Sequence, residues 1–316
     1  MVQVPTIGQI RSLSGKVKSG RYMGWNDGYI AVDWGTTNRR AYLIGSDRQI
    51  IDSFEDDVGL RAVPLDGFAQ QAVMIRARLG DKPMLLAGMV GARTGWRETP
   101  YVECPARPEQ LAETIVWIEP LRTGIVPGLC QREKPGPDVM RGEEVQILGA
   151  LAAKLVPPDA LICHPGTHSK WIILQDGKIA SFQTVMTGEI FSLIKTHSIL
   201  ADLLQEDVHE GLAFRAGVAE ALSGRAVLSA LFGIRARALL KQADGDGASW
   251  ASGLLIGADI AAGVKDYRGG PIALIGRPDL CVLYAAAAHQ AGYETFQIDG
   301  AEAFLAGIDL LTEMIA

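Results

Sequence analysis

The sequence lacks any apolar run near the roughly 20 residues that a membrane-spanning helix needs, which argues against an integral membrane protein. It also lacks a basic excess. Its 30 lysines and arginines stand against 36 acidic residues, a net charge of −6, whereas binding to a nucleic-acid backbone needs a basic face. With 316 residues, 48% hydrophobic and 21% charged, the chain has the composition of a soluble globular protein large enough for two lobes.

Cysteine is scarce as well, which bears on the cellular compartment. The four cysteines, Cys104, Cys130, Cys163 and Cys281, are scattered and form no CxxC pair. We therefore expect reduced thiols in a cytoplasmic protein, and neither a disulfide framework nor a cysteine metal site. Residues 1–28 are basic and irregular, and they lack the continuous apolar core of a secretory signal. We expect them to form a disordered leader.

A strand-and-turn motif that occurs twice is the most informative feature. The apolar run Tyr29–Trp34 leads into Gly35-Thr36-Thr37-Asn38, and the apolar run Leu161–His164 leads into Pro165-Gly166-Thr167-His168-Ser169. Each copy continues with a second strand, a polar turn and a third strand. This repeated unit is the plan of a two-lobed nucleotide phosphotransferase. In such enzymes the two turns face each other across a cleft and hold the phosphates of ATP.

The rest of the chain alternates helices and strands. A helix is predicted from the N-cap Asp66 through Arg78, and a buried strand over Pro83–Gly91, which together make a parallel crossover. Largely helical sequence follows over 188–264, and strand, helix, strand and helix are predicted over 272–315. The pattern predicts an α/β fold of duplicated βββαβα units, in which helices cover the faces of mixed sheets.

Asp33 and the turn that follows it are the first candidates for chemistry. Asp33 ends a buried strand, where its carboxylate can hold Mg²⁺ directly or through water. Glycine lets backbone N–H groups approach a phosphate, and threonine hydroxyls add donors. A tight hairpin with small polar caps is the structural alternative, but the repetition of the turn favours phosphate binding. The predicted cofactor-binding residues of the two turns are Gly35, Thr36, Thr37, Asn38, Gly166, Thr167, His168 and Ser169.

Seven motifs stand in order between Tyr29 and the C-terminus: Asp33–Asn38, Ala87–Gly91 with Gly95-Trp96, Ile125–Leu129, Val139–Glu144, Pro165–Trp171, Val185–Glu189 and Ser252–Ala258. Together they resemble the 2-dehydro-3-deoxygalactonokinase family, which belongs with the actin, hexokinase and Hsp70-like ATPases. The resemblance implies a two-lobed ribonuclease H-like fold with a central ATP cleft. It also implies transfer of the ATP γ-phosphoryl group to the 6-hydroxyl of 2-dehydro-3-deoxy-D-galactonate, in D-galactonate breakdown.

The Pro- and Gly-rich segment Lys134–Asp138 is the predicted connection between the lobes. We therefore place the N-terminal lobe, with the first phosphate turn and the sugar-acid side, at 29–138. The C-terminal lobe, with the second phosphate turn and the adenosine side, is placed at 139–316, with its last helix packing back on the N-terminal lobe.

The general base is predicted at the start of the helix that precedes the second meander. Many sugar kinases of this superfamily carry an Asp there, whereas this chain has Glu143 and Glu144 after Gly142. The resemblance aligns Glu143 with the base and leaves Glu144 as an orienting or metal-water ligand. The structural alternative is a pair of helix-start acids that complement the helix dipole.

A sugar-acid substrate predicts an arginine fork for its carboxylate, with Arg141 as the first candidate and Arg93 as the second. An exposed surface arginine is the alternative for each. Trp96 could stack on the sugar face, or it could simply fill space inside the lobe. Glu189 could bind a sugar hydroxyl, or it could be an acid that stabilises the start of a helix. The further substrate candidates are Trp96, Lys170, Thr187 and Glu189.

Two glycine-containing segments, Ser252–Gly257 and Ala273–Pro278, are the candidates for adenine binding. They supply Gly253, Gly257 and Gly276, although close helix packing is the alternative for Gly257. The family usually has a small residue after the last of these glycines, where this chain has Arg277-Pro278.

Two rival functions remain beside the ATP- and Mg²⁺-dependent kinase. One is a kinase for a related keto-deoxy sugar acid, such as the gluconate epimer. The other is a sugar-sensing regulator, which calls for a DNA-binding helix-turn-helix before residue 29, and the leader is too irregular to supply one. We expect the sugar acid and ATP as partners, without nucleic acid or membrane. The oligomeric state cannot be read from the sequence, and a homodimer is expected only as the commonest choice among soluble oligomers.

Overall fold

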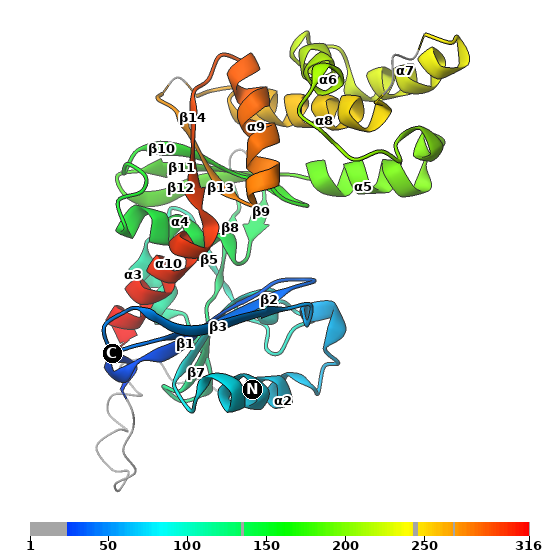
Figure 1. The fold of residues 1–316 in the computed structure, drawn as a ribbon. Helices are drawn as coiled ribbons and strands as arrows, with labels where there is room; N and C mark the ends of the chain where they lie inside the picture. Colours follow the sequence, from blue (N-terminus) through cyan, green and yellow to red (C-terminus); the bar gives the residue numbers. More distant parts are fainter. Residues whose placement is uncertain (1–23, 134–135, 243–245, 268, 316) are drawn as a thin grey trace, which may run out of the picture. The chain divides into compact units, whose positions relative to one another are not determined.

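The computed structural model describes residues 24–133, 136–242, 246–267 and 269–315 (Figure 1). They form two compact units. The first holds the described residues up to Leu155 with Gly177–Ile179 and 301–315, and the second holds Val156–Asp176 and Ala180–Gly300. The lobe boundary predicted at 138/139 lies within the first unit. The assignment of the sugar-acid side to one lobe and the adenosine side to the other stays a prediction.

The predicted leader and interlobe connection lie partly outside the described residues, since 1–23 and 134–135 are not among them. The last leader residues are ordered, contrary to expectation. They form a 3-10 turn, η2 (Trp25–Asp27), in which Trp25 is buried.

A six-stranded sheet forms the centre of the first unit. Its strands in spatial order are β3 (Ile50–Asp56), β2 (Arg39–Ile44), β1 (Tyr29–Trp34), β4 (Met84–Gly88), β7 (Thr123–Ile125) and β6 (Val116–Glu119). The first three strands are the predicted antiparallel meander, and β4 runs parallel to β1. Asp33 therefore stands opposite Arg40 on one side and Ala87 on the other. The predicted strand–helix–strand crossover is confirmed.

Helix α2 (Phe68–Leu79) makes that crossover. Its buried side chains recur every three or four residues, which is the period of one helix face. They are Phe68, Ala72, Ile75 and Leu79. The predicted N-cap is wrong by one residue: Gly67, and not Asp66, occupies that position, and no side chain bonds the first free N–H groups.

The second unit contains a five-stranded sheet on the same plan. Its strands in spatial order are β12 (Lys178–Val185), β11 (Ser169–Gln175), β10 (Ala160–His164), β13 (Ile272–Gly276) and β14 (Thr295–Asp299). Strand β11 is antiparallel to β10, and β13 is parallel to it. Two sheets that each join a meander to parallel strands confirm the predicted α/β fold of duplicated ribonuclease H-like units.

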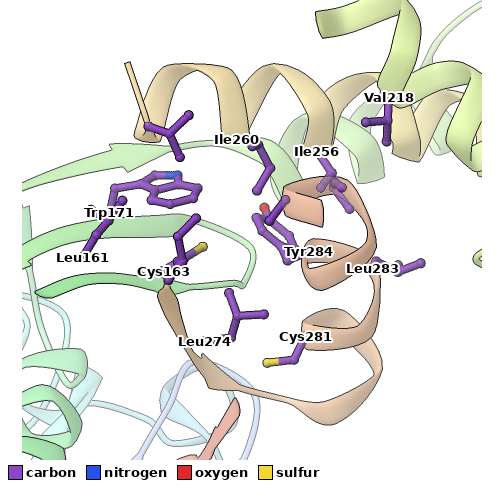
Figure 2. Packing of buried hydrophobic residues seen from close by; sticks show 14 of the residues in the cluster. Leu161, Cys163, Trp171, Val218, Ile256, Ile260, Leu274, Cys281, Leu283 and Tyr284 are labelled. Atoms are coloured by element: carbon purple, nitrogen blue, oxygen red, sulfur yellow. The ribbon is translucent and has the colours of Figure 1, made fainter. Parts of the chain in front are cut away.

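The described part of the second unit contains the helices α5 (Thr187–His197), α6 (Leu212–Leu222), α7 (Val227–Leu239), α8 (Gly247–Gly263) and α9 (Pro278–Gln290), with the 3-10 turn η5 (Ala201–Leu203). One core cluster joins the sheet to α8 and α9 through Trp171, Leu274, Ile260 and Tyr284 (Figure 2). Packing on the indole is tight, since a Cβ atom on Gly263 of α8 would lie 2.0 Å from the Trp171 ring.

Two further helices of the first unit, α4 (Glu143–Ala152) and α10 (Gly300–Ile315), were predicted from the sequence. The small three-stranded sheet was not predicted, nor were the short helices. They are β5 (Tyr101–Glu103), β8 (Gly128–Gln131), β9 (Asp138–Met140), α3 (Pro108–Glu113), η3 (Leu60–Ala62) and η4 (Met89–Gly91). Helix α10 is fastened to the meander within the unit, because Asp309 accepts hydrogen bonds from Tyr29 at 3.0 Å and from Arg48 at 2.7 Å.

Candidate functional site

The turn after β1 is held by the loop that follows β3. The carbonyl oxygens of residues 35–37 accept N–H groups of residues 59–61 at 3.0–3.2 Å. Thr37 and Asn38 are exposed. Because these carbonyl oxygens are engaged, the turn can present N–H groups and threonine hydroxyls outward, as a phosphate loop requires.

Two glycines bring the start of α4 beside the end of β1. Gly88 ends β4 with a φ of +92°, and a Cβ atom there would lie 2.7 Å from the Trp34 carbonyl oxygen. Gly142, the N-cap of α4, has a φ of +114°, and its Cβ atom would lie 3.2 Å from the Cα of Gly88. These conformations and close approaches require glycine. The first turn of α4 therefore packs near the strand end that carries Asp33.

The Asp33 carboxyl group is partly buried and titrates unusually high. Burial raises its pKa to about 6, the positive charge of Arg40 lowers it, and the negative charges of Glu143 and Glu55 raise it. An acid that titrates this close to neutrality, beside a second carboxylate, is typical of a functional position.

The neighbours Glu143 and Glu144 have different surroundings. Glu144 is fully buried at 0% exposure, and both of its carboxylate oxygens accept the Gly142 N–H, at 2.9 and 2.7 Å. Burial, with the charge of Glu143, raises the pKa of Glu144 to about 8. Glu143 is partly exposed and accepts the backbone N–H of Arg141 at 3.1 Å. Of the two acids, Glu143 is the one that a substrate can reach.

Arg141 is fixed to the segment after η4. Its guanidinium donates to the Thr99 carbonyl oxygen at 3.1 Å and to the Thr99 hydroxyl, and it lies 4.4 Å from the centre of the Tyr101 ring. Its Nε is buried and has no hydrogen-bond partner among the residues described. A fixed guanidinium with an unpartnered N–H is suited to binding a carboxylate.

The other two substrate candidates of the first unit are placed differently. Arg93 is exposed in the loop between η4 and β5. Trp96 is partly buried and packs against the main core cluster of the unit. The packing favours the plug role of Trp96 over stacking on a sugar.

The second turn, after β10, is tied to the start of α5. The Glu189 N–H donates to the Thr167 carbonyl oxygen at 2.9 Å, and a Cβ atom on Gly188 would lie 2.6 Å from the Gly166 carbonyl oxygen. The His168 ring contacts the Glu189 carboxylate. A predicted phosphate donor and a predicted sugar-binding acid are thus paired with each other.

Ser169 and Lys170 lie inside the second unit, at 0% and 5% exposure. The Ser169 hydroxyl lies 2.6 Å from the Tyr284 hydroxyl, and Lys170 stands opposite His164 in the β10–β11 ladder. Both side chains are buried within the hairpin, and the phosphate and substrate contacts predicted for them stay predictions.

A pocket of about 670 Å³ opens beside the second turn. Gly166 contributes to its lining, together with residues from the start of α5, residues 207–210, α8 and α9. Apolar side chains such as Phe191 and Leu255 share the lining with polar ones, among which Asp207, Glu210 and Asp279 are acids. Small-molecule sites commonly combine apolar walls with polar groups that fix the ligand's orientation.

The glycines of the predicted adenine motif are divided between packing and the pocket. Gly253 and Gly257 face α6, and a Cβ atom on Gly253 would lie 2.0 Å from the Phe214 carbonyl oxygen. Close helix packing, the structural alternative for Gly257, accounts for both glycines, and their nucleotide contact stays an untested prediction. Gly276 ends β13 just before α9, whose first-turn residue Asp279 lines the pocket. Gly276 therefore remains a nucleotide candidate.

Sequence reasoning missed Asp259 of α8, which is fully buried and accepts hydrogen bonds from Trp171, Thr187 and Tyr284. The Thr187 hydroxyl, predicted to hold a sugar hydroxyl, is engaged by this carboxylate. A single acid inside an otherwise uncharged, mostly buried helix was the signal that could have found it.

Among the described residues, no three His, Cys, Asp or Glu side chains gather into a metal site. No helix within the described ranges has both the length and the apolar character needed to cross a membrane.

The chain is similar to known proteins over most of its length. The sequence model of the 2-keto-3-deoxy-galactonokinase family matches residues 33–311. "Probable 2-dehydro-3-deoxygalactonokinase DgoK1" of Rhizobium meliloti is 37% identical over 303 residues, covering 91% of this chain and 97% of that protein. The 2-dehydro-3-deoxygalactonokinase of Escherichia coli is 35% identical over 295 residues, covering 91% and 98%. A crystal structure from Sinorhizobium meliloti, assigned to the same activity, has 35% identity and a TM-score of 0.84, covering 90% and 97%.

Proposed function

The chain belongs to the 2-keto-3-deoxy-galactonokinase family, and from this premise we propose that it uses ATP to phosphorylate the 6-hydroxyl of 2-dehydro-3-deoxy-D-galactonate in D-galactonate breakdown. The observation that carries the proposal for the site is at the start of α4. There the partly exposed carboxylate of Glu143 lies close enough for its charge to raise the pKa of Asp33, at the end of β1. The guanidinium of Arg141, two residues earlier in the chain, is held in place by Thr99.

Glu143 is the proposed general base, which accepts the proton of the 6-hydroxyl. A base must reach the proton that it takes, and Glu143 is partly exposed. Glu144 is buried, its oxygens are engaged by Gly142, and with a pKa of about 8 it is mostly protonated at neutral pH. Phosphoryl transfer depends mainly on positioning and electrostatics, so one placed carboxylate suffices.

Arg141 is the proposed partner of the substrate carboxylate. Thr99 and the Tyr101 ring hold the guanidinium in place, and its buried Nε–H has no partner among the described residues. Arg141 as a whole is partly exposed, so a sugar carboxylate would accept a charge-assisted hydrogen bond from the accessible part of the guanidinium.

Asp33 is the proposed protein ligand of Mg²⁺. This ion usually keeps several waters and takes one or two carboxylates together with the phosphates of its nucleotide. One strand-end carboxylate next to a phosphate turn fits that donor set, and a three-carboxylate cage is not needed. When bound, the ion neutralises charge on the transferred phosphoryl group.

The pocket of the second unit is the proposed adenosine site. Apolar walls such as Leu255 and Ile256 suit a purine, and Ser252 and Asp279 offer polar contacts. Gly166 of the second turn is among the lining residues, so a nucleotide in the pocket would place its phosphates near that turn.

A coupled assay of ADP release tests this function. With Mg²⁺ and ATP, release should rise sharply with 2-dehydro-3-deoxygalactonate and hardly at all with glucose or glycerol. Faster turnover of the gluconate epimer would support the rival sugar-acid kinase. Binding of the sugar acid without turnover would favour a sensor.

The proposal also includes a cytoplasmic location and a homodimer, the commonest oligomer. The described cysteines are all free thiols, which suits a reducing compartment. Sedimentation velocity on the purified chain would measure the oligomeric state.

A further inference from the structure

Asp259 joins four elements of the second unit at one buried carboxylate. It belongs to α8, and it accepts hydrogen bonds from Trp171 Nε1 of β11 at 2.7 Å, from Thr187 Oγ1 of α5 at 2.5 Å and from the Tyr284 hydroxyl of α9. The Tyr284 hydroxyl also lies 2.6 Å from that of Ser169, in β11. Trp171 and Tyr284 stand in the same core cluster in Figure 2.

These partners are parts of the proposed adenosine site. Thr187 and Tyr284 line the pocket directly, and α8 contributes Ser252, Leu255 and Ile256 to its walls. Ser169 and Trp171 follow the second phosphate turn along β11. The hydrogen bonds to Asp259 therefore connect α8 with α5 and α9, the other two helices that line the pocket. They also connect α8 with β11, the strand that follows the second phosphate turn.

The acidic side chain of Asp259 needs an explanation, because an apolar residue would fill the same space at lower cost. Isolating a carboxylate from water is costly unless it is well hydrogen-bonded. Burial raises the pKa of Asp259, while the hydrogen bonds from Thr187, Tyr284, Trp171 and Ser169 lower it. The named donors are hydroxyls and an indole, all neutral, so the acid serves as an acceptor for several groups at once.

We propose that Asp259 is the positioning residue of the nucleotide site: it fixes the Thr187 and Tyr284 walls, so that affinity for ATP and ADP depends on it. The inference rests on the proposed function of the pocket. Asp259 is 0% exposed and does not line the pocket, so it acts through Thr187 and Tyr284.

The test compares Asp259→Asn with wild type. ADP affinity is measured by calorimetry, and the KM values for ATP and for sugar acid are measured by turnover. The amide keeps the shape but replaces one acceptor oxygen with a donor. We expect the ADP Kd and the ATP KM to rise tenfold or more, and the sugar-acid KM to stay within twofold. Ile260→Ala, in the same helix and core, is the control that lowers Tm with ADP affinity unchanged.

Two substitutions at Thr187 test the role of Asp259 in ADP binding even if Asp259→Asn does not fold. Thr187→Val, which removes the hydroxyl, should weaken ADP binding, and Thr187→Ser, which keeps it, should bind like wild type. The proposal is overturned if Asp259→Asn is folded with ADP affinity within twofold of wild type. It is also overturned if the two Thr187 variants bind ADP equally, or if Ile260→Ala weakens ADP as much as Asp259→Asn does.

Ser252→Trp, which fills the pocket, separates this inference from the proposed function. If ADP binding survives that change, the pocket is not the nucleotide site, and its assignment as the adenosine site fails while the kinase function is still judged by the ADP-release assay. If Ser252→Trp abolishes ADP binding while the Asp259 and Thr187 variants bind normally, only the role of Asp259 is overturned.

Discussion

Burial raises the pKa of Asp33, at the end of β1, and the negative charge of Glu143, at the start of α4, raises it further. The two side chains are therefore close enough to interact through their charges. Phosphoryl transfer brings Mg²⁺ with the nucleotide and releases a proton from the acceptor hydroxyl, so a neighbouring pair of acids can divide these two tasks. The pairing is the physical basis for giving Asp33 the ion and Glu143 the proton.

Asp33→Asn should lower turnover by orders of magnitude and leave the fold intact, because the amide keeps the packing but loses the charge that holds Mg²⁺. Steady-state kinetics over a Mg²⁺ titration, with Tm as the check on folding, measure this. Asp52→Asn, which neutralises an exposed acid of the same sheet, is the matched control. Near-normal kcat in Asp33→Asn would remove this residue from the site.

The same acid predicts an acidic limit to activity. The pKa of Asp33 is about 6 in the free enzyme, so protonation below that pH removes the proposed metal ligand. We expect kcat/KM for MgATP to fall as pH drops through 6, since this ratio reports ionisations of the free enzyme. A profile that stays flat from pH 7 down to pH 5 would show that ionised Asp33 is not required.

Arg141→Ala should raise the KM for the sugar acid about tenfold to a hundredfold and hardly change the KM for ATP. The expected loss is one charge-assisted contact, worth about 1.5–3 kcal/mol. Arg141→Lys keeps the charge but loses the planar fork, so its effect should lie between. Arg93→Ala is the matched control. Should Arg93→Ala alone raise the sugar-acid KM, the carboxylate would be assigned to Arg93.

Glu144 predicts a pH dependence of stability. Its pKa is about 8 in the folded protein against an ordinary value of 4.5, so the folded state binds more protons between these pH values. Ionising the buried acid then costs stability as pH rises through that window. Relative to Glu144→Gln, wild type should lose Tm between pH 5 and 8, on the order of several degrees. The exposed variant Glu109→Gln should follow wild type throughout, and a constant difference between Glu144→Gln and wild type would contradict the prediction.

Local patterns allowed the meanders and the parallel crossover to be predicted but not the pocket. Strand, turn and crossover signals around β1 and β10 are contiguous in sequence, so the duplicated unit followed from them. Tyr284, Asp259 and Thr187 lie far apart in the chain and meet only through packing, which no local pattern contains. Gly253 shows a second reason: a glycine for close helix packing and one for ligand approach look identical in a sequence.

The account is tested most directly by the kcat of Glu143→Gln at saturating ATP and 2-dehydro-3-deoxygalactonate. Loss of the proposed base predicts a fall of about 10²–10⁴ in kcat, with both KM values nearly unchanged. Glu144→Gln, at the neighbouring buried acid, should lose clearly less. A kcat of Glu143→Gln close to wild type, or a larger loss in Glu144→Gln, would contradict the assignment of Glu143 as the base.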